Sequence, residues 1–225
     1  MPAGHLWKGT PIKLETEFII NRKLKPALET VGNTLAEVVK AQVYLRDVDD
    51  IPAFNEVWAR HFGANPPATS IITTSTPGFI CEQGRIEINT LSVRKGGATA
   101  KEAVYAEVAM PFAGQVPAVR AGELLFLSNL MAVNPGGSVA AGKDAGSQID
   151  HILAAAERIC AKAGTSLANV VRAQQFHTNL ADFAASWPAW RRHLGDRPLP
   201  YSAVEVPALA VPGATVMLDL WVYVP

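Results

Sequence analysis

The sequence is poor in the residues that mark several classes of protein. It has only two cysteines, Cys81 and Cys160, and their spacing fits neither a disulfide framework nor a metal site. We expect both to be buried, reduced thiols. The 20 Lys and Arg residues balance 20 Asp and Glu residues, so no surplus charge points to nucleic acid or an anionic membrane as a partner. No metal and no cofactor is predicted.

Long apolar runs are also missing. No stretch of about 18 apolar residues could cross a bilayer, and the opening residues MPAGHLWKGTPIKLE lack the apolar core of a signal peptide. These absences predict a soluble, cytoplasmic protein. Apolar residues nevertheless make up 49% of the 225 residues and charged residues 18%, which favours well-packed globular domains over disorder. The length suffices for two domains of about 100 residues each.

One stretch of the chain occurs twice. Residues 34–63 and 166–195 align without a gap at a constant offset of 132. Of the 30 aligned positions 12 are identical, and others are conservative, such as Lys40 with Arg172. Chance does not give this agreement. The chain is therefore predicted to hold two copies of one structural unit.

The first copy reads as helix, strand, helix, strand, strand. Apolar positions at helical spacing precede Gly32, a natural helix stop, and Pro26 should kink the first helix or end its first segment. Asp49 or Asp50 is placed to cap the second helix. The expected elements are a helix at 15–31, a strand at 38–45, a helix at 51–62, and strands at 70–76 and 85–93.

A linker separates the two units. Residues 94–101, RKGGATAK, contain a Gly pair and no apolar periodicity, which gives units at 1–97 and 98–225. Tight turns are expected at Ala121-Gly122 and at 134–137, NPGG. The second unit should contain strands at 104–110, 118–120 and 124–127, a helix at 147–163, a strand at 170–176, a helix at 183–193, and strands at 202–206 and 215–224.

The first unit is predicted to lack most of a strand hairpin that the second unit has. Only 31 residues precede Gly32, whereas about 54 residues separate Met110 from the matching Gly164. An unpaired sheet edge is rarely tolerated. Either residues 8–14 supply a substitute strand, or another chain covers the edge.

A set of segments carries a family resemblance. In the first copy these are VVKAQVYLRD, FNEVWARHF, PPATS and RIEINTLSV, and in the second copy PAVRAG and LLFLSNLMAVNPGG. In order and spacing they resemble the Rid family of reactive-intermediate, or imine/enamine, deaminases, also called YjgF-like proteins. The resemblance covers essentially the whole second copy and the first copy from about residue 15.

The resemblance implies an α+β fold of ferredoxin-like, chorismate-mutase-type units, each a mixed sheet with two helices packed on one face. Three such units close into a barrel with ligand sites between neighbours, which implies a homo-oligomer, a trimer. Typical members hydrolyse imines and enamines to a keto acid and ammonia. In them an arginine clamps the substrate carboxylate, a carboxylate holds the attacking water, and an SGQ-like turn supplies a backbone N–H.

The chain departs from this pattern. Thr69 and Tyr201 occupy the two places of the arginine, so neither copy keeps the clamp. In the first copy Glu87 stands at the position of the family's glutamate and Asn55 at that of an interface asparagine, whereas the second copy has Met217 and Trp187 at these positions. Ser128-Asn129-Leu130 corresponds to the SGQ turn, and Gln115 replaces an aromatic residue.

These remnants predict one composite cleft made by both copies. Glu87 would position water and Asn55 would assist it; the substrate would be bound by Thr69, Ser128, Asn129 and Tyr201. Without the arginine a substrate carboxylate loses about 1.5–3 kcal/mol of charged hydrogen bonding. The predicted activity is therefore hydrolysis or deamination of an imine-, enamine- or amide-like metabolite that is neutral or differently charged.

Two other functions stay open. Glu87 could be a solvent-facing or ion-paired carboxylate, and the protein would then be a non-catalytic ligand-binding or assembly protein. Ribonuclease activity, attributed to some relatives of the family, fits poorly with zero net charge.

Overall fold

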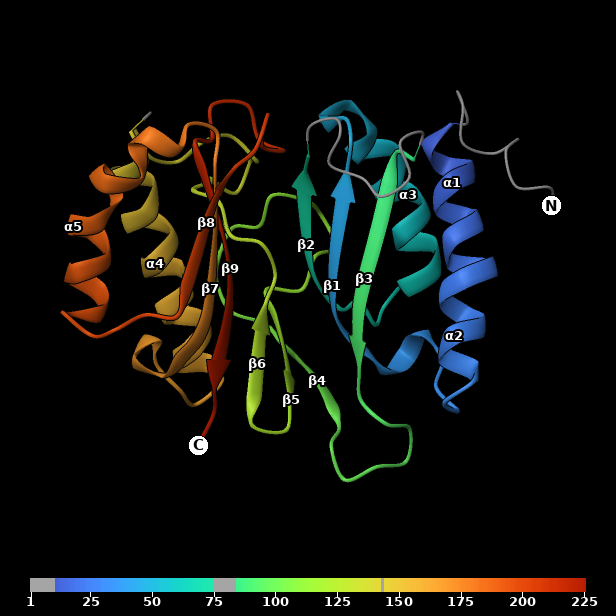
Figure 1. The fold of residues 1–225 in the computed structure, drawn as a ribbon. Coiled ribbons are helices and arrows are strands. Elements are labelled where there is room, and N and C mark those ends of the chain that lie inside the picture. Colours follow the sequence, from blue (N-terminus) through green and yellow to red (C-terminus); the bar gives the residue numbers. More distant parts are fainter. Residues whose placement is uncertain (1–10, 75–83, 143) are drawn as a thin grey trace.

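Two β-sheets face each other at the centre of the molecule, and helices cover the outer face of each sheet (Figure 1). The computed structural model describes residues 11–74, 84–142 and 144–225. The first sheet has the strand order β2-β1-β3, and the second sheet has the order β4-β5-β6-β9-β7-β8. Both mix parallel and antiparallel pairs, so the predicted α+β class is confirmed. In the described ranges no helix combines the length and apolar character needed to span a membrane.

The N-terminal half follows the predicted order of elements. They are α1 (Ile12–Ile19), a π-helical turn (Ile20–Leu24), α2 (Lys25–Glu29), β1 (Val38–Leu45), α3 (Ile51–Phe62), β2 (Ala68–Thr73) and β3 (Ile86–Ser92). The bounds predicted for β1 and α3 are confirmed. β2 begins two residues before the predicted strand, whose last residues, 75 and 76, lie outside the described residues.

The helical segment continues past Pro26 because a turn of the wider π-helix lies just before it. The π-helical turn precedes α2, in which Pro26 stands near the start. Proline lacks an N–H and crowds the preceding turn, and a π-turn gives the backbone more room. The helical segment begins at Ile12, three residues before the predicted start, and Gly32 follows its end with a φ of 76°.

Asp50 occupies the N-cap position of α3, as one of the two predicted alternatives had it. The Asp50 side chain makes no capping hydrogen bond. However, its carboxylate accepts three hydrogen bonds from the Arg85 guanidinium, Nε to Oδ2 at 2.9 Å, Nη2 to Oδ1 at 2.8 Å and Nη2 to Oδ2 at 2.7 Å. The turn before α3 is capped by Asp47, whose Oδ1 accepts from the Asp49 N–H at 3.0 Å. Asp50 thus links the start of α3 to Arg85, the residue directly before β3.

The C-terminal half differs from the prediction mainly at its start. Its elements are β4 (Lys101–Val104), β5 (Ala118–Ala121), β6 (Leu124–Leu127), α4 (Ala145–Lys162), β7 (Val170–His177), α5 (Phe183–Leu194), β8 (Tyr201–Glu205) and β9 (Val216–Tyr223). The strand predicted at 104–110 is wrong, because only Val104 of that range is in a strand and β4 lies mostly before it. β4 pairs with β5 from Lys101 onward, so the end of the predicted linker belongs to the sheet. The tight turn at Gly122 is confirmed, with a φ of 61°.

The repeated residues take up the same structure in both halves. β1 and β7 begin 132 residues apart, and so do α3 and α5. Each of the two strands has one parallel and one antiparallel neighbour, β2 and β3 for β1, and β8 and β9 for β7. The registers also match, since Gln42 pairs with Asn89 and the equivalent Gln174 pairs with Asp219. Tyr44 pairs with Glu87 as Phe176 pairs with Met217, which confirms that Glu87 and Met217 are equivalent.

The two sheets differ at the side of β3 and of its equivalent β9. In the second sheet β9 continues to the hairpin β5–β6, whereas β3 pairs only with β1 among the described residues. Residues 8–10 lie outside the described residues, and Ile12 to Leu14 are helical, so the substitute strand predicted at 8–14 is wrong for its second part. β2 is buried along its whole length, but the equivalent strand β8 is mostly exposed.

A buried ion pair joins the two sheets. Lys40 on β1 is 1% exposed and Asp219 on β9 is fully buried, and Lys40 Nζ lies 3.1 Å from Asp219 Oδ2. Lys40 also donates to Ser70 Oγ at 2.9 Å and to the Leu127 carbonyl at 2.7 Å. Burial lowers the pKa of Lys40, and the charge of Asp219 opposes that shift. The ammonium thus has three acceptors, one in the first sheet and two in the second.

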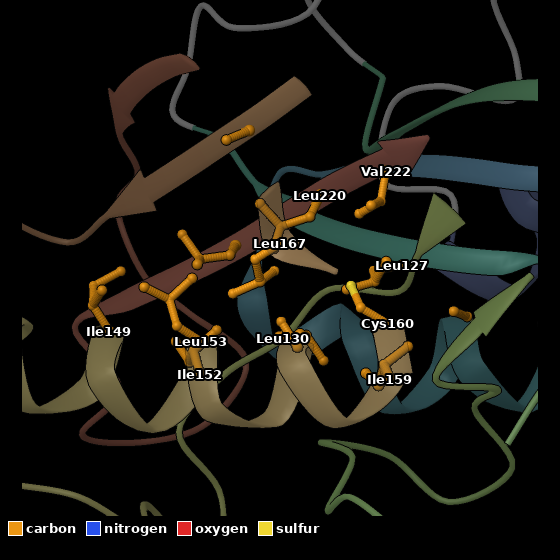
Figure 2. Close-up of a cluster of buried hydrophobic side chains, with 14 of the residues drawn as sticks. Leu127, Leu130, Ile149, Ile152, Leu153, Ile159, Cys160, Leu167, Leu220 and Val222 are labelled. Carbon is orange, nitrogen blue, oxygen red and sulfur yellow. The ribbon is translucent and has the colours of Figure 1, made fainter. Parts of the chain in front are cut away.

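Each sheet has its own apolar core on the helix side. Figure 2 shows that of the second sheet, where Ile152, Leu153 and Cys160 of α4 face Leu127 and Leu220. Cys160 is a free, fully buried cysteine, so the prediction of a buried, reduced thiol is confirmed for this residue, and burial raises the pKa of its thiol to about 12. Cys81 lies outside the described residues.

Replacing Lys40 by Met is expected to lower the free energy of unfolding by about 3–5 kcal/mol, because Asp219 would stay buried without a counter-charge. The double variant Lys40→Met/Asp219→Leu should lose less than the single variant, since it leaves no buried charge. Urea unfolding followed by circular dichroism measures both. The exposed Lys162→Met is the matched control; a Lys40→Met cost no greater than that of this control would contradict the role given to the pair.

The open edges of the two sheets bear on the predicted homo-oligomer. β3 has an unpaired side among the described residues, and on β8 Tyr201 is 48% and Val204 45% exposed. Exposed strand edges with apolar side chains favour association. Sedimentation velocity should therefore give a mass above the 24.0 kDa of one chain, with a trimer as the predicted species. A monomer across the micromolar range would rule the trimer out.

Candidate functional site

A cleft opens where α3 meets the segment before β5. Its volume is about 100 Å³. The side chains that shape it are Asn55, Trp58 and Phe62 of α3, Thr69 of β2, and Phe112 and Gln115 of the C-terminal half. Both halves of the chain therefore build it, as the repeat predicted, and two of the predicted site residues, Asn55 and Thr69, lie in it together.

The cleft is held by hydrogen bonds between β2 and the turn after β6. The Thr69 N–H donates to Ser128 Oγ at 3.0 Å, and the Asn129 N–H donates to the Thr69 carbonyl at 3.1 Å. Ser128 Oγ in turn donates to the Val116 carbonyl at 2.6 Å. Ser128 and Asn129 are fully buried and do not line the cleft. They lie behind Thr69, where they fix its position.

Two carboxamides and an apolar wall determine what the cleft can bind. Gln115 donates from Nε2 to Asn129 Oδ1 at 3.4 Å, which ties it to the buried turn, and Asn55 reaches the cleft from α3. Trp58 packs against Phe62 in a tilted arrangement with ring centroids 4.2 Å apart, and the two rings make the apolar wall. Among the described lining residues there is no Arg, Lys, His, Asp or Glu. The cleft therefore offers neutral donors and acceptors, without a general acid or base.

Glu87 lies on the other face of the first sheet. It pairs directly with Tyr44, whereas Thr69 pairs with Ala41. Residues 41 and 44 point to opposite faces because side chains alternate along a strand, and Ala41 packs into the core beneath α3. Glu87 is therefore turned toward the second sheet and does not line the cleft. The composite cleft predicted to hold Asn55, Thr69 and Glu87 together is wrong in this respect.

Glu87 has polar neighbours of its own. Asn89 Nδ2 donates to Glu87 Oε1 at 3.4 Å. Burial, together with the charge of Asp219, raises the pKa of the Tyr44 hydroxyl, and the Glu87 charge adds to this rise. Near the Ser128-Asn129 turn the position equivalent to Glu87 is held by Met217, which is fully buried in an apolar cluster.

Tyr201 takes no part in the cleft. It lies in the C-terminal half, where its ring stacks on Phe183 at 5.6 Å and lies 6.2 Å from Trp187. Tyr201 and Trp187 are the repeat equivalents of Thr69 and Asn55. Aromatic rings thus occupy the positions that form the cleft in the first copy.

The aromatic lining was missed in the sequence. Trp58 recurs in the repeat as Trp190, a pattern that favours a core residue, and Phe112 falls in an irregular segment outside the repeat. Within the ranges that the structure describes, no group of three or more His, Cys, Asp or Glu side chains could hold a metal ion.

Comparison with known proteins places both halves in one family. The family model described as Endoribonuclease L-PSP matches residues 11–93 and 106–224. A RutC family protein of Pyrococcus abyssi is 39% identical over 73 residues, which cover 32% of this chain and 56% of that protein. Another RutC family protein, from Saccharolobus solfataricus, is 37% identical over 67 residues, 30% of this chain and 52% of that protein. The chain thus spans about half the length of the curated relatives it matches.

Solved structures show the same fold over about half of the chain. The structure of YEO7 from yeast superposes with a TM-score of 0.51 at 20% identity, covering 56% of this chain and 100% of that one. The Rid family protein YyfA from Yersinia pestis gives a TM-score of 0.50 at 24% identity with the same coverage. Since the family model matches most of both halves, the chain belongs to the Endoribonuclease L-PSP family, also called the Rid, YjgF or RutC family.

Proposed function

We propose that this protein binds a small, uncharged, partly apolar molecule in the cleft between its halves and does not transform it. The observation that carries the proposal is the lining of that cleft. It places the Asn55 and Gln115 carboxamides beside the rings of Trp58, Phe62 and Phe112, with no ionisable side chain among the described lining residues. An amide-like ligand matches these groups, since a carboxamide donates and accepts at once.

The proposal includes the organisation of the chain. We infer two L-PSP-type units in tandem, at 1–97 and 98–225, that meet as neighbouring subunits of the family would. The equal order and register of the strands around β1 and β7 support this. One chain then contains one complete cleft, because the turn that closes it belongs to the second unit, covers β2 of the first, and has no counterpart among the described residues of the first unit.

Hydrolysis of an imine, enamine or amide is the second candidate function. One observation favours it. Glu87, the family's water-positioning residue, is partly exposed on the face toward the second sheet, with Asn89 and Tyr44 beside it. Such a reaction would take place away from the Asn55 cleft, so that the two candidate functions depend on different residues.

Binding in the cleft can be tested with benzamide, a neutral amide with an apolar ring. We expect binding by isothermal titration calorimetry, and an affinity about two- to tenfold weaker in Asn55→Ala, which loses one neutral hydrogen bond. The matched control is Glu56→Ala, the exposed neighbour of Asn55 on α3, which should bind benzamide like the unchanged protein. Equal affinity in Asn55→Ala, or no binding at all, would exclude this use of the cleft.

Hydrolysis can be tested by release of ammonia from enamines generated in solution. If the second candidate is right, Glu87→Gln lowers kcat/KM by about 100-fold or more, because it removes the general base and keeps the size of the side chain. Asn55→Ala should leave this rate unchanged. Turnover that is unaffected by Glu87→Gln would refute the assignment, and absence of turnover with every enamine would favour the binding protein.

A further inference from the structure

A second cavity lies between the two sheets and shares no lining residue with the cleft. Its volume is about 140 Å³, several times the ~30 Å³ that one water occupies in the liquid. Its walls come from four strands, with Lys40 and Gln42 on β1, Asn89 and Leu91 on β3, Arg172 on β7, and Trp221 on β9. It is large enough for a small organic molecule.

The repeat places equivalent residues on opposite sides of this cavity. Lys40 pairs with Leu91 across the first sheet, and Arg172, its equivalent, pairs with Trp221 across the second. The two cations differ in what they contact. Lys40 has its three acceptors in Ser70, Leu127 and Asp219. Its hydrogen-bonding capacity is used by the fold.

Arg172, in contrast to Lys40, has no set of hydrogen-bond acceptors among the described residues. Its guanidinium carbon lies 4.4 Å from the centroid of the Trp221 ring, and no acceptor from the described part of the chain is bonded to it. By contrast, Arg60, Arg85 and Arg192 each contact a carboxylate. Stacking uses the flat face of a guanidinium and leaves its N–H groups at the edge. A half-buried arginine is thus held beside a cavity, and its N–H groups have no acceptor among the residues that the structure describes.

A second donor at the same cavity lacks a partner. The indole Nε1 of Trp221 is buried and has no acceptor among the described residues. Buried donors without acceptors are uncommon in folded proteins. Both unpaired donors belong to residues that line the cavity, so the site calls for a ligand rich in acceptor atoms.

The surrounding charges favour a single negative charge on that ligand. Lys40 and Arg172 are the charged side chains among the described lining residues. Asp219 is bonded to Lys40 and to Gln42 Nε2, and the Glu87 carboxylate, which accepts from Asn89, is not part of the lining. Since Asp219 pairs with Lys40, Arg172 is the lining cation without a carboxylate partner among the described residues. A monoanion neutralises it, whereas a dianion such as phosphate would add repulsion from the buried Asp219. Leu91 and Trp221 offer apolar contact to the rest of the ligand.

We propose that this cavity is a binding site for a small organic monocarboxylate, clamped by Arg172. The two carboxylate oxygens accept from the edge of the guanidinium, as in other bidentate arginine–carboxylate pairs. The hydrocarbon part of the ligand packs against Leu91 and Trp221. This site is independent of the proposed amide-binding cleft, and its occupancy does not require the cleft to be filled.

Calorimetric titration of the full chain with acetate, propionate and benzoate tests the site. At least one should bind with a Kd below about 10 mM, and its affinity should fall about tenfold or more in Arg172→Gln, which loses the charged hydrogen bonds. Arg172→Lys keeps the charge but lacks the fork and should also bind more weakly. The matched control Arg158→Gln removes an exposed arginine of α4 and should leave the affinity unchanged.

Further measurements separate this site from the cleft. Propionamide, the neutral analogue of propionate, should not bind through Arg172, and Asn55→Ala should bind the carboxylate normally. Inorganic phosphate should bind more weakly than the best carboxylate. Circular dichroism melting shows whether the Arg172 variants are folded. Absence of binding by all three carboxylates, equal binding of propionate and propionamide, or unchanged affinity in Arg172→Gln and Arg172→Lys would each overturn the proposal.

Discussion

The contact between the two sheets is the constraint on which the rest of the structure depends. Most α+β units leave one sheet face to be covered, and here each half covers the other. The contact surface is polar at its centre, where Lys40, Asp219, Gln42 and Gln174 are linked. Buried charges are costly unless they are paired and hydrogen-bonded, so this arrangement tolerates little displacement of one half relative to the other. The positions of the cleft and of the second cavity follow from it.

The two copies of the repeat differ in how the strands at the edges of their sheets are covered. Among the described residues, the hairpin β5–β6 and the turn that follows it have no counterpart in the N-terminal half. That turn buries β2 by direct hydrogen bonds to Thr69, while β8, the same strand in the other copy, stays mostly exposed. The first copy therefore forms a cleft. In the second copy Tyr201 stacks on Phe183 instead, and Trp187 contacts both rings in tilted geometry.

Charge is distributed unevenly between the two cavities. The cleft, where the family resemblance leads one to expect an arginine, has neutral amides and aromatic rings. The cavity between the sheets has two cations, one of which is without an acceptor in the described part of the chain. A ligand without charge suits the first, and a monoanion suits the second. The two proposed sites thus differ in charge, and different variants test them.

The sequence alone determined the elements and their repetition. Equal residues at a fixed offset placed β1, α3, β7 and α5 within a residue of their observed bounds, because apolar periodicity and Gly stops are local signals. It also placed Asn55 and Thr69 in one cleft with the C-terminal half. The tertiary structure alone decided that Glu87 faces away from them. That depends on strand register, since a shift of one residue turns every side chain to the other face. The site between the sheets was likewise undetermined, because Arg172 and Leu91 are distant in sequence and meet only through the packing of the two halves.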